Sequence, residues 1–339
     1  MRMRQLVIVA VCCSGFALAA ATGKVDPKAP AKGVKTPGVQ IPFASLKAEA
    51  EVPLAGPPSA LLVAPPNLIA PNGAKVDRIE GRGAKLSEAP AATGIRSACG
   101  GAVSAFDSIW IPDCGAQSIQ RVNLKAGKIT GSLETGTPKQ ATAPLIAANP
   151  DSIWMLSDTL TTLSRIDPET NSVVAAIRLP EQCSALAFGE SALWAACPKI
   201  NKVLRLDPKT NAVAKTIETA AKPVAIAFGE GSVWVLGEAE GKISRIDPKT
   251  NTVSATIDLA VPAAGGGSLA YGEGYLWISM PGFPLTKVAA EGNKVVQQFL
   301  GPGLGGGPIA TGFGSVWLAQ GNKLLRFDPK RIAATLAEE

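Results

Sequence analysis

Six tryptophans recur at nearly equal intervals along this chain of 339 residues. They stand at Trp110, Trp154, Trp194, Trp234, Trp277 and Trp317, and they are the only tryptophans in the sequence. The text around them recurs too, most clearly as Ala-Phe-Gly-Glu-Gly-Ser-Val-Trp-Val at 227–235. A period of about 40 residues with several short β-runs is typical of propeller blades rather than of helical solenoids. The sequence therefore predicts an all-β fold, a β-propeller of four-stranded antiparallel blades.

The best-preserved repeat divides into four strands, an inner strand, a Trp strand, a third strand and an outer strand, at 224–228, 232–236, 242–246 and 252–259. A degenerate repeat at 59–86 keeps the period, because Ile69 stands one repeat length before Trp110. We therefore expect seven blades, with six as the alternative. The segment 45–54 reads like an outer strand, and we expect it to pair with the last blade. Such closure removes the long sheet edges of an open arc.

A turn motif, Asp-Pro-x-Thr-Asn, follows the third strand at 167–171, 207–211 and 247–251. Its aspartate can accept hydrogen bonds from the next backbone amides, and its asparagine tolerates left-handed backbone, so we interpret it as turn chemistry rather than as a repeated catalytic carboxylate. An arginine stands two positions before the turn aspartate, on the same side of the strand. We expect ion pairs with that aspartate for Arg165, Arg205, Arg245 and Arg326.

The first residues have the pattern of an export signal. Arg2 and Arg4 precede an apolar run, and small residues that suit a cleavage site follow it, which predicts a signal peptide at 1–21. An uncleaved anchor is the alternative. Residues 22–43 are rich in Pro, Ala and Lys and read as a disordered linker, and 44–339 as a single propeller domain. Loss of Arg2 and Arg4 lowers the formal charge from +6 to +4, which does not indicate nucleic-acid binding.

The four cysteines beyond the signal form two equivalent pairs. Cys99 and Cys183 stand at the same distance before a tryptophan, while Cys114 and Cys197 closely follow the same two tryptophans. Residues equidistant from a hairpin turn face one another, which predicts the disulfides Cys99–Cys114 and Cys183–Cys197. A metal site of four thiolates is the alternative, disfavoured because no Cys-x-x-Cys pair is present.

The phrases Ile-Asp-Pro-Lys-Thr-Asn-Thr-Val and Ala-Phe-Gly-Glu-Gly-Ser-Val-Trp-Val resemble those of two groups of bacterial exported propellers. One is the YVTN (YncE-like) group and the other the streptogramin lyase (virginiamycin B lyase) group. The resemblance covers about 59–336 and is specific for the architecture. The lyase group implies a magnesium-dependent elimination with a histidine as base. This chain has no histidine, so that role is carried over to no residue.

The absence of histidine also excludes a Ser-His-Asp triad, Cys-x-x-Cys-His haem attachment and a histidine-built zinc site. The glycine runs 265–267 and 305–307 are not followed by Lys-Ser or Lys-Thr, so we interpret them as crossing loops and not as phosphate loops.

Any ligand site should lie where the loops of one face surround the central channel, that is, the outer-to-inner loops and the loops after the Trp strands. Polar candidates on these loops are Asp113, Asp158, Glu181, Gln182, Lys199, Lys222, Glu238 and Gln320. Each can also be an ordinary solvated loop residue. As a set, the carboxylates offer ligands that Mg²⁺ or Ca²⁺ prefers.

Two functions remain open on the sequence. One is a periplasmic or secreted propeller that binds a protein, peptide or cell-envelope ligand without catalysis. The other is a metal-dependent lyase or lactone hydrolase that lacks the usual histidine. We expect no membrane span after signal cleavage, no nucleic-acid partner and a monomer.

Overall fold

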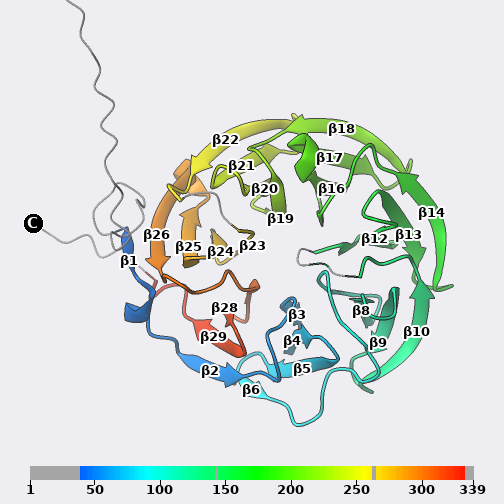
Figure 1. Cartoon of the computed structure of the whole chain (residues 1–339), viewed down its shortest axis with the longest axis horizontal. Helices are drawn as coiled ribbons and strands as arrows, with labels where there is room; N and C mark the ends of the chain where they lie inside the picture. The colour runs from blue at the N-terminus through cyan, green and yellow to red at the C-terminus, as the bar shows by residue number, and fades with distance from the viewer. Residues whose placement is uncertain (1–38, 140, 142–143, 262–264, 333–339) are drawn as a thin grey trace, which may run out of the picture. The chain divides into compact units, whose positions relative to one another are not determined.

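Seven sheets arranged in a ring make up the body of the protein (Figure 1). The structure is a computed structural model that describes residues 39–139, 141, 144–261 and 265–332. The predicted signal peptide at 1–21 and residues 22–38 of the predicted linker lie outside the described residues. Among the described residues, no helix is long and apolar enough to cross a membrane. The seven-bladed propeller is thus confirmed, and the six-bladed alternative is wrong.

Each blade uses the predicted order of strands from the channel outward. Blades 1 to 3 comprise β3 (Leu62–Ala64), β4 (Asn67–Asn72), β5 (Lys75–Glu80), β6 (Lys85–Leu86), β7 (Val103–Ala105), β8 (Ser108–Asp113), β9 (Ser118–Asn123), β10 (Lys128–Glu134), β11 (Ile146–Ala148), β12 (Ile153–Ser157), β13 (Thr162–Asp167) and β14 (Ser172–Arg178). Blades 4 and 5 comprise β15 (Ala185–Gly189), β16 (Ala192–Cys197), β17 (Lys202–Asp207), β18 (Ala212–Glu218), β19 (Pro223–Gly229), β20 (Ser232–Gly237), β21 (Lys242–Asp247) and β22 (Thr252–Asp258). Blades 6 and 7 comprise β23 (Ser268–Gly272), β24 (Tyr275–Met280), β25 (Phe283–Ala289), β26 (Lys294–Leu300), β27 (Ile309–Gly312), β28 (Ser315–Gln320) and β29 (Lys323–Phe327).

The six tryptophans occupy equivalent places on the second strand of blades 2 to 7. All six side chains are fully buried. In blades 4 to 7 the indole N–H donates to the backbone carbonyl of the glycine that ends the inner strand, at 3.0–3.1 Å. In blade 1 the equivalent residue is Ile69, which pairs in register with Arg78 as each tryptophan pairs with its own third-strand cation. The sequence repeat therefore places these tryptophans in equivalent surroundings.

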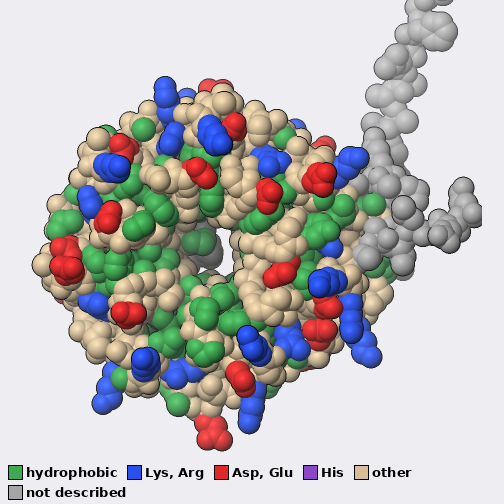
Figure 2. All heavy atoms as spheres, turned by 180° about the vertical axis from the view of Figure 1, so that it is seen from behind, with side chains coloured by type: hydrophobic (Ala, Val, Ile, Leu, Met, Phe, Trp, Pro, Cys, Tyr) green, Lys and Arg blue, Asp and Glu red, His purple; other side chains and the backbone are tan. Residues whose placement is uncertain are grey.

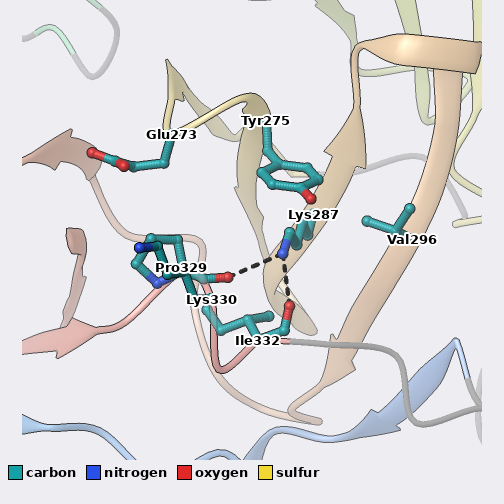
Figure 3. Close-up of a pocket in the computed structure, with 7 residues that line it drawn as sticks. All are labelled: Glu273, Tyr275, Lys287, Val296, Pro329, Lys330 and Ile332. Atoms are coloured by element: carbon teal, nitrogen blue, oxygen red, sulfur yellow. Dashed lines mark hydrogen bonds between the residues drawn. The ribbon is translucent and has the colours of Figure 1, made fainter. Parts of the chain in front are cut away.

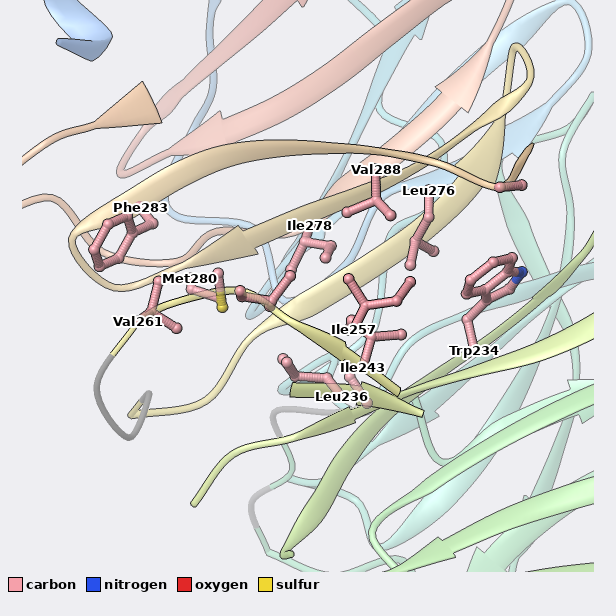
Figure 4. Close-up of a cluster of buried hydrophobic side chains, with 13 residues drawn as sticks. Trp234, Leu236, Ile243, Ile257, Val261, Leu276, Ile278, Met280, Phe283 and Val288 are labelled. Carbon is pink, nitrogen blue, oxygen red and sulfur yellow. The ribbon is translucent and has the colours of Figure 1, made fainter. Parts of the chain in front are cut away.

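Neighbouring sheets pack face to face through apolar side chains. Between blades 5 and 6, Trp234, Ile243 and Ile257 of one sheet lie against Leu276 and Val288 of the next (Figure 4). Because both faces of each sheet are covered in this way, the strands need no alternation of apolar and polar residues. Burial of both faces of each sheet is consistent with the high hydrophobic content of the sequence, which is 46%.

A cation from each blade reaches into the next blade, and the seven contacts together close a cycle that we call the latch ring. In each contact, which we call a latch, the side chain of the cation donates a hydrogen bond to a backbone carbonyl in or beside the third-to-outer turn of the following blade. The donor–acceptor distances are 2.6–3.2 Å. The pairs are Arg78 to Leu124, Arg121 to Pro168, Arg165 to Pro208, Arg205 to Pro248, Arg245 to Ala290, Lys287 to Pro329 and Arg326 to Arg82. In blades 2 to 7 the cation also lies over the indole of its own blade.

The latch ring corrects one prediction. No ion pair among the described residues joins Arg165, Arg205, Arg245 or Arg326 to the aspartate two positions later. The predicted ion pairs are wrong because the guanidinium turns away from its own turn, stacks on the tryptophan and binds the neighbouring blade. The turn interpretation itself is confirmed, since the Asp207 carboxylate accepts the backbone N–H of Lys209 at 2.8 Å.

The N-terminal segment fastens the ring. As predicted for 45–54, β2 (Ala50–Pro53) pairs antiparallel with β29 and completes blade 7. A further strand, β1 (Gln40–Pro42), adds to blade 6 in parallel with β26. Between them η1 (Phe43–Ser45) places the Phe43 ring 6.4 Å from that of Phe299 and 6.2 Å from that of Phe327. The paired segment therefore starts inside the range 22–43 predicted as a linker, because its apolar residues pack against two blades.

Both predicted disulfides are present. Cys99 bonds to Cys114, with their Cα atoms 5.9 Å apart, and Cys183 bonds to Cys197. The four sulfurs are thereby used, so the alternative of a four-thiolate metal site is wrong. The second bridge ties the segment before β15 to the end of β16, next to η2 (Pro198–Ile200). Both bridges suit an oxidising compartment.

Candidate functional site

A hollow of about 520 Å³ lies at the end of the channel where the inner strands begin. Residues from six of the seven blades line it, which places it on the axis of the ring. Most of them come from the two kinds of loop predicted from the sequence, the outer-to-inner loops and the loops after the Trp strands, and the rest come from the inner strands β19, β23 and β27. We call this hollow the mouth. Figure 2 shows one face of the ring, where apolar side chains gather around the central opening.

The mouth has two unlike walls. Blades 6 and 7 contribute a wall that consists mainly of glycines and prolines, comprising Gly265, Gly266, Gly267, Pro281, Gly306, Gly307 and Pro308. A Cβ on Gly307 would collide with the carbonyl of Ala319, so glycine is required there for two backbones to approach closely. A Cβ on Gly265 would meet only Pro281, at 3.9 Å. The apolar Leu61 and Val224 also line the mouth.

Blades 4 and 5 contribute the polar wall. Lys222 and Glu238 form an ion pair with 2.8 Å between Nζ and Oε2, and they are the charged residues among those that line the mouth. The Glu238 side chain is 15% exposed and that of Lys222 is 55% exposed. Lys222 has left-handed backbone, with φ of 57°, and its N–H donates to the side-chain oxygen of Asn201 at 2.9 Å. The pair is therefore held from both the side chain and the backbone.

Ser184 adds a hydroxyl to the same wall. Its Oγ is buried and has no hydrogen-bond partner among the described residues. It follows Cys183 directly, and its backbone N–H donates to the carbonyl of Ala196 at 2.8 Å. The disulfide and this hydrogen bond thus restrain the backbone that carries the hydroxyl.

Two of the eight predicted polar residues, Lys222 and Glu238, line the mouth, and six do not. Asp113 is fully buried, and its carboxylate accepts backbone N–H groups from Arg96, Ser97, Gly115 and Ala116 at 2.8–3.1 Å. Both of its oxygens are engaged in holding two chain segments together. Asp113 is therefore structural in this fold.

The other five candidates are engaged with their own neighbours. Asp158 pairs with Arg178 at 3.4 Å, and Glu181 pairs with Lys199 at 3.6 Å. A hydrogen bond from the backbone N–H of Gln182, reinforced by Lys199, holds the pKa of Glu181 below its ordinary value. The amides of Gln182 and Gln320 donate to the backbone carbonyls of Thr159 and Gly305.

The predicted loop carboxylates are not brought together. Among residues 39–139, 141, 144–261 and 265–332, no group of three or more His, Cys, Asp or Glu lies close enough to hold a metal ion. Asp113 bonds backbone amides, and Asp158, Glu181 and Glu238 each face a cation. Binding of Mg²⁺ or Ca²⁺ therefore stays a prediction, and the described residues offer no set of ligands for it.

A second hollow, of about 510 Å³, lies at the seam between blades 6 and 7 (Figure 3). Lys287 lies in its wall, replaces the latch arginine of other blades, and donates to the carbonyls of Pro329 at 3.0 Å and Ile332 at 2.7 Å. Its Nζ lies 3.9 Å from the centre of the Tyr275 ring. Tyr275 in turn replaces a serine that bonds the latch arginine in blades 2, 3 and 5. Two carbonyls and an aromatic face thus surround the ammonium. We call this contact, in which lysine and tyrosine replace arginine and serine, the variant latch.

Sequence reasoning missed the glycine wall and Ser184 as parts of the mouth. The glycine runs are predicted correctly between outer and inner strands, but their close approach to Met280 and Ala319 depends on packing between blades. The latch ring has a signal in the sequence that could have been used. A cation follows each tryptophan at a nearly constant spacing, as Arg205 follows Trp194.

Two solved structures share the architecture. One is a catalytically inactive variant of virginiamycin B lyase from Staphylococcus aureus, with one histidine replaced by alanine, in a crystal structure with quinupristin. It has a TM-score of 0.67 and 18% identity, and the match covers 82% of this chain and 98% of the other. The other is hydrazine synthase of Kuenenia stuttgartiensis, with a TM-score of 0.53 and 13% identity, covering 62% of this chain and 70% of the other.

No protein-family model and no curated protein matches the chain. At such low identities the two structures establish likeness of fold only. The predicted resemblance to the streptogramin lyase group thus holds for the architecture, and the resemblance to the YVTN group stays a prediction.

Proposed function

We propose that this protein is an exported propeller that binds a ligand at the mouth without catalysis. The mouth is a hollow of about 520 Å³ with one wall mainly of glycines and prolines and another that carries a few polar groups, a composition typical of small-molecule sites. Its loops are held by a rigid scaffold of seven sheets.

The observation that carries the non-catalytic reading is the absence of histidine. The virginiamycin B lyase variant is inactive with one histidine replaced, and its structure still contains quinupristin. A propeller of that architecture can therefore hold a ligand without turning it over. The present chain contains no histidine at any position.

Export is part of the proposal. It is supported by the signal-peptide pattern at 1–21 and by two disulfides, which persist in oxidising compartments. We therefore propose a periplasmic or secreted protein. Fractionation of cells that express the full chain, followed by mass measurement of the mature N-terminus, tests this assignment. Retention of an intact signal in the membrane fraction supports the anchor instead.

Calorimetric titration of the mature chain, residues 22–339, with quinupristin tests ligand binding. We expect saturable binding, and at least a tenfold loss in Gly265→Leu, because Gly265 lines the mouth and a Cβ there meets only Pro281, at 3.9 Å, so the added bulk causes no clash within the fold. Gly305→Leu is the matched control, since it also adds leucine without a clash within the fold but does not line the mouth. Equal affinities of the two variants contradict binding at the mouth.

The enzymatic alternative, a Mg²⁺- or Ca²⁺-dependent lyase or lactone hydrolase, is tested in the same mixtures. Quinupristin is incubated with the protein and an excess of Mg²⁺ or Ca²⁺ that saturates weak sites, and its mass and retention on a reversed-phase column are followed. We expect neither to change. Ring opening that requires the metal overturns the non-catalytic reading.

A further inference from the structure

We infer that the Lys222–Glu238 pair selects ligands that present to it an uncharged edge with a secondary amide, so that the amide carbonyl accepts from Lys222 and the amide N–H donates to Glu238. This inference rests on the proposed function and specifies the chemistry of the same mouth. It depends on three features of the polar wall, which are the neutrality of the pair, its partial burial and a hydroxyl, on another residue of the same wall, that has no partner among the described residues.

The pair is neutral as a unit. Its Nζ and Oε2 atoms lie 2.8 Å apart, and no other charged residue lines the mouth in the described part of the chain. A ligand that brings a positive or negative charge against the pair competes with one member for the other. Because the Glu238 side chain is only 15% exposed, separation of the pair leaves a largely buried carboxylate without its cation. Loss of one partner from such a pair is costly.

A secondary amide avoids that cost. An ammonium has three donors and a carboxylate about four acceptor sites, so the contact at 2.8 Å leaves capacity on both groups. An amide presents one acceptor and one donor, and it can bind both groups while the ion pair stays intact. Hydrogen bonds to charged groups are stronger than those between neutral groups.

Ser184 is a further polar residue of the same wall. Its Oγ is buried and without a partner among the described residues, and buried polar atoms normally have one. The opposite wall offers mainly glycine and proline, with open space at Gly266 and only Pro281, at 3.9 Å, near Gly265. The fitting ligand therefore has a polar, amide-bearing edge toward blades 4 and 5 and an uncharged, apolar edge toward blades 6 and 7.

Three small probes with one skeleton test this selection. They are N-acetylglycine N-methylamide, which is neutral, N-acetylglycine, which is an anion, and glycine N-methylamide, which is a cation. The readout is the shift of backbone amide signals of Ser184, Lys222 and Glu238 in the isotope-labelled mature chain. We expect the neutral probe to bind at least fivefold more tightly than either charged probe.

Variants of the pair complete the test. Lys222→Met and Glu238→Gln are each expected to weaken the neutral probe about tenfold, the size of one hydrogen bond to a charged group. The exchanged pair, Lys222→Glu with Glu238→Lys, keeps a donor and an acceptor at the wall and should bind the neutral probe within about twofold of wild type. The Lys202→Met variant, which removes another partly exposed paired lysine outside the mouth, is the control.

The outcomes separate the two proposals. If a charged probe binds at the mouth as tightly as the neutral one, the selection is wrong while binding at the mouth stands. If no probe shifts these signals and quinupristin does not bind either, both are wrong. If quinupristin binds but its affinity is unchanged in Lys222→Met and Glu238→Gln, the pair has no part in recognition.

Discussion

The guanidinium of Arg205 lies 2.6 Å from the side-chain oxygen of Asn251, one blade further round the ring. The same guanidinium stacks over the indole of Trp194, with its carbon 5.5 Å from the ring centre. Arg165 makes the same contact with Asn211, so the asparagine of the turn motif serves the neighbouring blade as well as its own turn. The repeat is thus preserved in part by contacts between blades.

Replacing Arg205 by alanine should lower the free energy of unfolding by about 2 kcal/mol, because a partly buried carbonyl and an asparagine lose a charged donor. Urea unfolding of the mature chain measures this change in the free energy of unfolding. Lys215→Ala on the exposed face of the next strand is the control. In a double-mutant cycle with Asn251→Ala, additive losses would show that the two side chains do not interact.

The variant latch of blade 6 should depend on pH. Burial lowers the pKa of Lys287 below its ordinary value of 10.5. Between that lowered pKa and 10.5 the unfolded chain binds the proton and the folded chain does not, so the contribution of this lysine to stability rises with pH across that window. The gain is absent at pH values below the folded-state pKa, where both states carry the proton.

The pair of changes Lys287→Arg and Tyr275→Ser rebuilds the latch of the other blades, and it should remove this pH dependence because arginine stays charged. Lys287→Arg alone should be less stable than the pair, since Tyr275 occupies the place of the serine that bonds the arginine elsewhere. Urea midpoints at several pH values up to 10.5 measure both effects. If the urea midpoint changes with pH by the same amount in the wild type and in the double variant, Lys287 is not the titrating group.

The turn aspartates should titrate below the ordinary range. A backbone hydrogen bond from Lys209 holds the pKa of Asp207 below 3.8, and one from Lys249 does the same for Asp247. A carboxylate with a lowered folded-state pKa contributes stability above its unfolded pKa and loses it as pH falls through the folded value. Carbon-detected NMR titration of Asp207, with the Asp207→Asn variant to assign its signal, checks this. A midpoint at or above 3.8 contradicts it.

Loss of the second disulfide should loosen both the body and the mouth. The Cys183→Ser, Cys197→Ser variant opens a loop with a sequence separation of 14, which corresponds to about 3 kcal/mol. Thermal unfolding measures the loss. The Cys99→Ser, Cys114→Ser variant should lose a similar amount of stability, yet retain ligand affinity, because that bridge does not border the mouth. Equal loss of affinity in both would show that the second bridge has no special part in shaping the mouth.

Truncation of the Phe43 side chain should weaken ring closure. Phe43→Ala removes edge contacts to Phe299 and Phe327 and should cost about 2 kcal/mol, since the ring is half-buried. Lys47→Ala, at an exposed position just after the same turn, is the control. Hydrogen exchange at β26 and β29 locates the effect. Exchange that rises evenly over all seven blades would argue against a local fastening.

The sequence was sufficient for the architecture because the tryptophans and turn motifs are local signals. The strands of blade 5, both disulfides and the pairing of 45–54 with the last blade all followed from spacing. The same reasoning misplaced the arginines, because Arg165 has a carboxylate nearby in sequence but finds its partners at Pro208 and Asn211. Contacts between blades are hard to recognise within one repeat.

The site was less predictable for the same reason. The two kinds of loop that border the mouth were predicted correctly. Whether a polar residue on such a loop faces the channel depends on its backbone conformation and its neighbours. Asp113 turns inward to cap two segments, while Lys222 is oriented by a left-handed backbone and a hydrogen bond to Asn201. The glycine runs looked like plain connections in the sequence, yet they form most of one wall in the structure.

Gln40 pairs with Gln298, which lies in the sixth of the seven blades. Until blade 6 has been synthesised, β1 has no strand to join, and β2 must wait for the last strand of all. Contacts this distant in sequence slow folding, since the intervening chain must first be ordered. A chain that stops short of blade 7 keeps its sheet edges open to other chains, so the final repeat decides whether the product matures as a closed ring or aggregates.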